Sequence, residues 1–217
     1  MTILDSDIEK LRKNYAMDAM DEKSVLGNPL EQFKLWFNEA VQGQCDEPNA
    51  FILSTIDAGR PRGRVVLFKG FHKTGIVFYT NYHSPKGHEL KALPMGAATF
   101  LWLPLQRQVR IEGRVEQIPE EMSDSYFSKR PYGSQIGAIA SPQGKVVSSR
   151  QELEEAFAHT KNFFPEGKPV PRPKTWGGFV LVPDRWEFWQ GRPNRLHDRI
   201  IYDSETNGEW AKKRLAP

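Results

Sequence analysis

The feature that most constrains the fold is a series of short strand-like runs separated by turn signals. The runs span residues 50–56, 63–71, 75–81, 97–103, 108–117, 177–183, 185–190 and 195–202, and a last one reaches Leu215. Turn residues such as Asp57-Ala58-Gly59 and Asn207-Gly208 join neighbouring runs, and Asn-Gly is a strong hairpin signal. Consecutive strands with short turns favour an antiparallel barrel over a parallel βαβ sheet. We therefore expect a mainly β fold with peripheral helices, of the α+β class.

Helix signals interrupt the strands at a few places. Ser6 and Glu9 are spaced as a capping box and predict a helix over residues 7–20. Further helices are expected to start at Pro29, to run from Pro85 to before Pro94, from near Pro119 to Lys129, and from Ser149 to before Pro165. Because residues 20–27 are polar and weakly patterned, we expect residues 1–27 to form an N-terminal arm and residues 28–217 to form a single domain.

Composition argues against several classes of protein. The net charge is only +3 and no long basic run is present, so we expect no nucleic-acid partner. Cys45 is the only cysteine, which rules out an intrachain disulfide and a Cys-rich zinc site, and no metal-binding histidine spacing is found. Glycine-rich dinucleotide and P-loop motifs are also missing. With no membrane span or signal-peptide pattern, we expect a cytoplasmic protein that binds no membrane.

Residues 195–202 carry the strongest functional signal in the chain. On a strand alternate side chains share a face, so Arg195, His197 and Arg199 would form one cationic stripe. A solvated sheet face is one interpretation of this stripe. Three aromatic residues within 186–189 precede it and favour the edge of a cleft. The working hypothesis is therefore a pocket for an anionic ligand.

Two cationic positions lie nearer the N-terminus. Arg64 and Lys69 stand at the ends of an apolar strand; their spacing predicts that they point to opposite faces and could serve two ligands. Lys86 lies in the first turn of an expected helix, where free N–H groups suit phosphate. A capped helix with an exposed lysine is the alternative interpretation.

A third cluster combines a phenol, a guanidinium and a hydroxyl. Tyr126, Arg130 and Ser134 recur at intervals of four and could form a phosphate cradle, although Tyr–Arg stacking on a helix surface needs no ligand. Gln108 could bind the edge of a heterocycle or could simply be exposed. Such an inventory, rich in cations and aromatic rings and poor in acids and nucleophiles, suits phosphorylated planar molecules and leaves the hard chemistry to a cofactor.

Eight motifs, taken in order and spacing, resemble a known family. They are RVVLFK (64–69), FYTN (78–81), RQVRIEG (107–113), YFSKRP with SQIGA (126–138), WGGF (176–179), EFWQG (187–191), RLHDR (195–199) and RLAP (214–217). From about Leu11 to Pro217 the chain resembles the pyridoxine (pyridoxamine) 5′-phosphate oxidases. The resemblance implies an FMN-binding split β-barrel that forms a homodimer, with two FMN sites across the subunit interface.

The resemblance also assigns site residues. FMN contacts are implied for Arg64, Val65, Val66, Leu67, Phe68, Lys69, Tyr79, Thr80, Lys86, Gln108, Gln143, Trp189 and Arg199. Substrate contacts are implied for Lys69, Tyr126, Arg130 and Ser134 at the phosphate, for Arg195, Leu196 and His197 near the ring, and for Arg12 and Tyr15 in an N-terminal lid. Arg195 and His197 are the implied catalytic residues.

The implied reaction is the oxidation of pyridoxamine 5′-phosphate or pyridoxine 5′-phosphate to pyridoxal 5′-phosphate, in vitamin B6 biosynthesis or salvage. A hydride equivalent passes from C4′ to the flavin, and O₂ is reduced to hydrogen peroxide. Two positions depart from the family pattern: Pro85 stands where a basic residue commonly holds the FMN phosphate, and Gly144 stands where a serine often contributes a hydroxyl. Another split-barrel flavoprotein, such as a flavin reductase, and a non-catalytic binder of pyridoxal phosphate are the alternatives.

Overall fold

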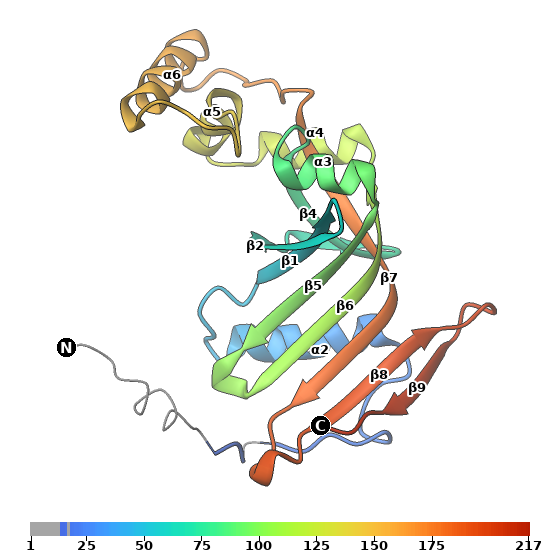
Figure 1. Ribbon diagram of the computed structural model, residues 1–217. Helices are drawn as coiled ribbons and strands as arrows, with labels where there is room; N and C mark the ends of the chain where they lie inside the picture. The colour runs from blue at the N-terminus through green and yellow to red at the C-terminus, as the bar shows by residue number, and fades with distance from the viewer. Residues whose placement is uncertain (1–13, 17) are drawn as a thin grey trace. The chain divides into compact units, whose positions relative to one another are not determined.

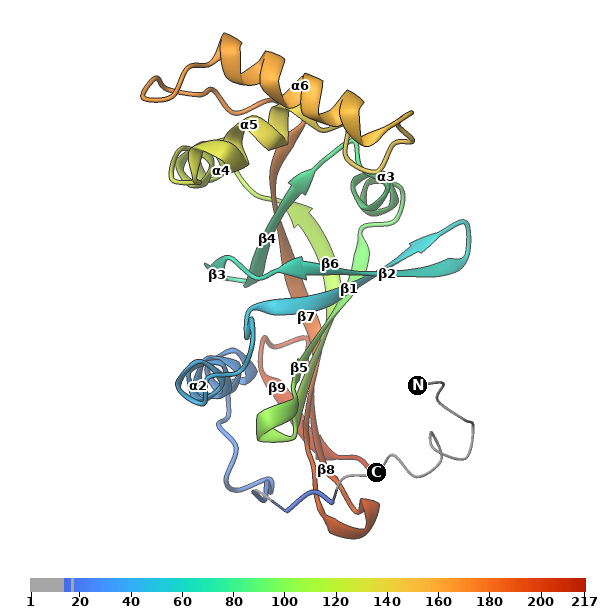
Figure 2. The ribbon, with the colours of Figure 1, turned by 90° about the vertical axis from the view of Figure 1, so that its left-hand side faces the viewer.

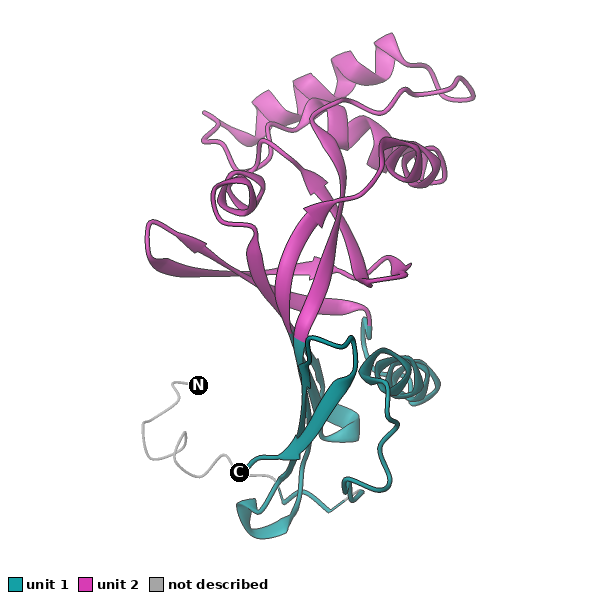
Figure 3. Cartoon of the chain, turned by 90° about the vertical axis from the view of Figure 1, so that its right-hand side faces the viewer, with its two compact units in different colours: residues 1–48, 99–111, 185–217 teal, residues 49–98, 112–184 magenta. Residues whose placement is uncertain are grey.

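The chain contains two compact units, which Figure 3 colours separately. The structure, a computed structural model, describes residues 14–16 and 18–217. Unit 1 comprises the described residues up to Pro48 together with 99–111 and 185–217, and unit 2 comprises 49–98 and 112–184. Three strands contribute residues to both units: β5 (Met95–Trp102), β6 (Arg107–Gln117) and β7 (Trp176–Gln190).

Unit 2 is built on antiparallel strand pairs. β1 (Ala50–Asp57) pairs with β2 (Arg60–Leu67), and this register places Leu53 opposite Arg64. β3 (Gly70–His72) pairs with β4 (Gly75–Asn81), and β4 pairs in turn with the first part of β7, where Tyr79 lies opposite Gly178. The hydrogen-bonded strand order is β2-β1-β5-β6-β7-β4-β3, which can be followed by the labels of Figure 1.

Four helices complete unit 2: α3 (Pro85–Ala92), α4 (Glu120–Ser128), α5 (Tyr132–Ala140) and α6 (Arg150–Phe163). The side chains of Ser84 and Ser149 cap α3 and α6 by accepting hydrogen bonds from backbone N–H groups of the first turn. Figures 1 and 2 show α4, α5 and α6 grouped beyond one end of β4. A buried cluster of Phe127, Ile136 and Trp176 joins α4 and α5 to the start of β7.

Unit 1 contains the helix α2 (Pro29–Gln42), which Asn28 caps by accepting hydrogen bonds from the backbone N–H groups of Leu30 and Glu31. The Phe33 ring of α2 is fully buried, 4.9 Å from the ring of Phe100 and 5.6 Å from that of Trp186. Two further strands, β8 (Asp198–Ser204) and β9 (Trp210–Arg214), continue the antiparallel pairing from the second part of β7. An aromatic core therefore fixes α2 against the strand segments of unit 1.

Most of the expected elements are present, and the mainly β fold with peripheral helices is confirmed. Two expected strand boundaries are wrong here, because residues 63–71 divide between β2 and β3 and residues 177–190 belong to the single strand β7. The helix α5 has no counterpart among the expected elements. The helix expected over residues 7–20 lies largely outside the described residues, and its described residues, 14–16 and 18–20, form no helix.

None of the helices in the described part of the chain is both long and apolar enough to cross a membrane.

The aromatic core of unit 1 yields a stability prediction. Phe33→Ala removes a fully buried ring and should lower the free energy of unfolding by about 3–5 kcal/mol. Leu35→Ala on the same helix is the matched control, because the Leu35 side chain is 44% exposed, and it should change the free energy by about 0.5 kcal/mol or less. Urea unfolding measures both. Similar losses in the two variants would contradict the placement of the core.

Candidate ligand-binding site

A cavity of about 480 Å³ lies in unit 2 among β2, β4, α3 and α4. Its lining residues are Arg64, Val65, Val66, Leu67, Lys69, Tyr79, Thr80, Lys86, Tyr126, Arg130, Gln143 and Trp176. Apart from Trp176, every one of them is a residue that the resemblance assigned to the flavin or to the substrate. The fold thus brings together residues from six separate stretches of the chain around one space.

Arg64 is held at the cavity by partners on β1 and α3. Its Nη1 donates to the Thr55 hydroxyl and, at 3.2 Å, to the Leu53 carbonyl, while Nη2 donates to the Glu89 carboxylate at 2.7 Å. The Thr55 hydroxyl donates in turn to the same carboxylate. Glu89 is buried and Arg64 is mostly buried, so each charge depends on the other for its compensation. The guanidinium is therefore fixed in direction before any ligand binds.

Lys86 lies in the first turn of α3, directly after Pro85. Its Nζ donates to the hydroxyl of Thr80 at 3.2 Å and to the side-chain carbonyl of Gln143 at 3.4 Å. Burial lowers the pKa of Lys86, and the neighbouring Arg64 lowers it further, whereas Glu89 acts in the opposite direction. A bound anion would favour the ammonium form, so the site is arranged to accept negative charge.

Lys69 departs from its expected geometry. β2 ends at Leu67, so the alternation of faces stops before Lys69, and Arg64 and Lys69 line the same cavity. The expectation that they point to opposite faces is therefore wrong. Phe68, an expected flavin contact, is buried with its ring 4.9 Å from that of Phe71, and it is not among the described residues that line the cavity.

Three parallel aromatic rings form one wall of the cavity. The ring of Tyr79 stacks on that of Tyr126 at 4.0 Å and on that of Trp176 at 5.3 Å. Gly178, opposite Tyr79 in the ladder, makes room for this ring, because a Cβ there would lie 2.8 Å from it. Burial raises the pKa of Tyr79 to about 12 and also raises that of Tyr126. Both phenols therefore stay protonated at neutral pH and can donate hydrogen bonds.

Arg130 has an unsatisfied donor. Its guanidinium carbon lies 4.6 Å from the centroid of the Trp176 ring, and its Nη1 is buried with no hydrogen-bond partner. Burial lowers the pKa of Arg130. Because an unpaired buried donor is costly, an anionic acceptor at this position would be strongly favoured. Arg130 also lines an adjoining cavity of about 290 Å³ together with Ser134, an exposed residue of α5.

The cationic stripe of residues 195–199 does not form as expected. β8 begins only at Asp198, and both Asn194 and Arg195 have a positive φ, of 57° and 62°. A left-handed backbone cannot continue a strand, so Arg195 and His197 precede the strand and do not share its face. Arg195 and Leu196 are exposed. These residues belong to unit 1.

His197 is oriented by the backbone of its own loop. Its Nδ1 accepts a hydrogen bond from the N–H of Arg192 at 3.0 Å, so in the neutral ring the proton lies on Nε2. Burial lowers the pKa of His197, and the nearby Arg195 lowers it further, with Asp198 opposing. The ring lies 4.7 Å from that of Trp189 and 5.8 Å from that of Tyr15. His197 therefore offers an N–H donor near neutral pH.

The remaining expected residues are also placed, with one exception. Arg199 donates to the buried Glu187 carboxylate at 2.8 Å and to the Ala216 carbonyl at 2.9 Å. Gln108 is half-buried on β6. Arg12 lies outside the described residues.

Sequence reasoning missed three residues that shape the cavity: Thr55, Glu89 and Trp176. Glu89 follows Lys86 by three positions in α3, so helical spacing could have placed the two on one face. Thr55 reaches Arg64 only through the pairing of β1 with β2. The turn at residues 57–59 indicated this hairpin, but no local signal gave the register that brings the two side chains together. Trp176 appeared only as part of a motif, without a role.

Known proteins of one family match this chain over most of its length. A model of the pyridoxamine 5′-phosphate oxidase family matches residues 37–163, and one of the pyridoxine 5′-phosphate oxidase C-terminal dimerisation region matches residues 176–217. The chain is 47% identical over 213 residues to a pyridoxine/pyridoxamine 5′-phosphate oxidase of Cytophaga hutchinsonii, covering 98% of this chain and 99% of that one. It is 49% identical over 214 residues to the Salinibacter ruber protein of the same name, covering 98% and 100%.

Solved structures show the same fold. PhzG from Burkholderia lata 383, solved in complex with tetrahydrophenazine-1-carboxylic acid, matches with a TM-score of 0.86 at 27% identity, over 93% of this chain and 99% of that one. This shared fold is the split β-barrel that the resemblance implied. The chain belongs to the pyridoxine/pyridoxamine 5′-phosphate oxidase family, and the resemblance seen in its motifs is confirmed.

The electrostatics of His197 can be tested directly. Because Arg195 contributes to the lowered pKa of His197, Arg195→Leu should raise that pKa toward the ordinary value of about 6.5. Arg195→Lys keeps the charge and should leave the pKa low. NMR titration of the His197 ring resonances measures both variants. If Leu and Lys shift the pKa equally, the charge of Arg195 is not the cause.

Proposed function

We propose that this protein is an FMN-dependent oxidase that converts pyridoxamine 5′-phosphate or pyridoxine 5′-phosphate to pyridoxal 5′-phosphate, with O₂ reduced to hydrogen peroxide. The observation that carries this proposal is that two sets of cations, Arg64 with Lys86 and Lys69 with Arg130, line one cavity. FMN and a phosphorylated pyridine each carry one phosphate, so two cation sets match the two ligands. The names of the family's relatives support the same reaction.

FMN suits the donors around Arg64. A phosphate needs positive charge and N–H or O–H donors, and Arg64 and Lys86 supply both. The lowered pKa of Lys86 means that a phosphate beside it would be stabilising, because the ammonium would gain a counter-charge. When bound, FMN would supply the two-electron oxidation and the reaction with O₂, which amino-acid side chains do not provide.

The substrate phosphate is assigned to Arg130 and its neighbours. The unpartnered Nη1 of Arg130 would gain an acceptor, and the protonated phenol of Tyr126 would donate a second hydrogen bond. Lys69 adds charge at the exposed rim, and Ser134 adds a hydroxyl from the adjoining cavity. These groups would anchor the far end of the substrate and so position its reacting carbon.

Arg195 and His197 are assigned to the reacting end of the substrate. The exposed guanidinium of Arg195 would orient the amine or hydroxyl on the carbon that is oxidised. His197 would hydrogen-bond the same group through its Nε2 proton, because its Nδ1 is already engaged by the backbone of Arg192. In this tautomer His197 positions the substrate and does not remove a proton through Nε2.

The proposal also assigns a homodimer and a lid over the bound substrate. A model of a dimerisation region matches residues 176–217, and we assign a homodimer with two FMN sites across its interface. Tyr15, whose ring lies 5.8 Å from that of Trp189, would belong to a lid that excludes water during the reaction. The same lid would include Arg12. The cellular role would be vitamin B6 biosynthesis or salvage.

Oxygen-dependent turnover with added FMN tests the proposed reaction. We expect pyridoxal 5′-phosphate and hydrogen peroxide to form in equal amounts from either substrate, as measured by product absorbance and a peroxidase-coupled assay. Flavin binding without pyridoxal 5′-phosphate formation would favour another split-barrel flavoprotein. Failure to bind flavin, with pyridoxal 5′-phosphate still bound, would favour a non-catalytic carrier.

The assignment of Arg130 predicts a defect in substrate affinity. Arg130→Ala should raise the KM for pyridoxine 5′-phosphate by about 10- to 100-fold, the value of a charge-assisted hydrogen bond, while flavin affinity stays unchanged. Arg150→Ala is the matched control, because that side chain is 84% exposed on α6, and its KM should equal that of the native protein. An unchanged KM in Arg130→Ala would remove Arg130 from the phosphate site.

A further inference from the structure

Pro85 and Gly144, the two positions at which the resemblance implied a departure from the family pattern, lie beside each other. Pro85 is the first residue of α3, and Gly144 lies in the loop after α5. A Cβ placed on Gly144 would lie 2.3 Å from Cδ and 2.9 Å from Cγ of the Pro85 ring. Real Cβ atoms do not approach that closely, so the proline ring occupies the space that a side chain at 144 would need.

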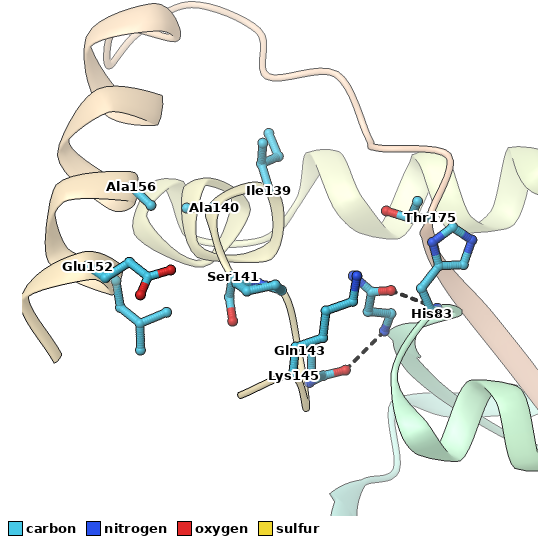
Figure 4. Close-up of a pocket in the computed structure, with 12 residues that line it drawn as sticks. His83, Ile139, Ala140, Ser141, Gln143, Lys145, Glu152, Ala156 and Thr175 are labelled. Carbon is cyan, nitrogen blue, oxygen red and sulfur yellow. Dashed lines mark hydrogen bonds between the residues drawn. The ribbon is translucent and has the colours of Figure 1, made fainter. Parts of the chain in front are cut away.

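This contact adjoins a polar clamp. Gln143 precedes Gly144, and its side-chain carbonyl accepts hydrogen bonds from the Thr80 hydroxyl at 2.9 Å, the Asn81 N–H at 3.2 Å and the Lys86 ammonium at 3.4 Å. Lys86 itself follows Pro85. The loop and the start of α3 are thus joined by two neighbouring contacts, one apolar and one polar. Figure 4 labels Ser141, Gln143 and Lys145 of this loop, which line a pocket together with His83.

Backbone geometry restricts which residues can stand at positions 85 and 144. Gly144 has a φ of +81°, a conformation that glycine adopts without strain and that other residues resist. The ring of Pro85 is rigid and fits the first position of a helix. The Pro85 ring leaves no space for a side chain at position 144, and the loop conformation also favours glycine there. Proline at 85 and glycine at 144 are therefore sterically compatible, although neither residue brings a polar side chain to the expected flavin site.

We propose that Pro85 and Gly144 are a coupled positioning pair that holds Gln143 against Lys86 and so sets the protein's preference for FMN over unphosphorylated riboflavin. This inference rests on the proposed function, since it takes the phosphate beside Lys86 to be that of FMN. Gln143 and Lys86 both line the large cavity. If a substitution displaces the loop that carries Gln143, the Lys86 ammonium loses the Gln143 carbonyl as an acceptor and is no longer held in its orientation. Phosphate binding weakens, whereas binding of the flavin ring does not.

A double-mutant cycle tests the coupling. Flavin-free native protein, Pro85→Ala, Gly144→Ala and the double variant are each titrated with FMN and with riboflavin, and the Kd is taken from the quenching of flavin fluorescence. We expect Gly144→Ala to weaken FMN binding by about tenfold or more and to leave riboflavin binding within about twofold. Pro85→Ala should have a smaller effect, and the double variant should bind FMN more tightly than Gly144→Ala, because the clash is gone.

Gly167→Ala is the matched control for backbone strain. Gly167 has a φ of +84° with nothing within 4 Å of a Cβ, so its substitution imposes the same conformational penalty without a clash. It should leave the ratio of the FMN and riboflavin affinities unchanged and should show no coupling to Pro85→Ala. Multiplicative effects of Pro85→Ala and Gly144→Ala on the FMN Kd, or equal losses for FMN and riboflavin, would overturn the proposal.

A second readout separates this inference from the proposed function. Urea midpoints of the same four proteins report the contact without any ligand, and the double variant should unfold at a higher midpoint than Gly144→Ala. Native protein that binds neither flavin would contradict the proposed function and the role in phosphate preference together. Additive midpoints would contradict the coupling itself, whether or not flavin binds.

Discussion

The cost of burying positive charge is the constraint on which the rest of the site depends. A buried cation must find a carboxylate, a ring of hydrogen-bond acceptors or a ligand. Arg64 uses Glu89, and Arg199 uses Glu187. Lys86 instead donates to hydroxyl and amide oxygens, and Arg130 rests on an aromatic ring with one donor unpaired. Lys86 and Arg130 are therefore the cations whose burial cost a bound anion would reduce most.

Aromatic stacking gives the cavity its rigidity. The parallel rings of Tyr79, Tyr126 and Trp176 come from β4, α4 and β7, so the wall depends on the packing of all three elements. The stack in turn supports Arg130, whose guanidinium lies over Trp176. Offset and stacked rings contribute beyond their buried area, and a wall formed before binding reduces the entropy lost when a planar ligand enters.

The sequence predicted the membership of the site better than its geometry. The resemblance to a known family implied eleven of the twelve residues that line this cavity, because the motifs of the chain match that family in order and spacing. The expected strand over residues 195–202 failed at Asn194 and Arg195, whose positive φ depends on the loop around them. Local periodicity cannot report such a conformation, and it cannot report the reach of Thr55 to Arg64 across two strands.

The relation between Pro85 and Gly144 shows the same limit. Each residue looked like an isolated loss when only the chain was known, since 59 positions separate them. In the folded protein the two residues pack against each other. In the proposed coupling this packing positions the Gln143 side-chain amide, which the Lys86 ammonium contacts. Arg64 and Lys86 are then the cations that a phosphate would meet in this cavity. Glu89 already neutralises part of the charge of Arg64.

A crystal structure of the protein grown with FMN would show where the flavin phosphate binds. We expect this phosphate to lie within hydrogen-bond distance of both Arg64 and Lys86, in the cavity walled by Tyr79, Tyr126 and Trp176. A flavin phosphate bound elsewhere, with Arg64 and Lys86 keeping only their present partners, would contradict this expectation.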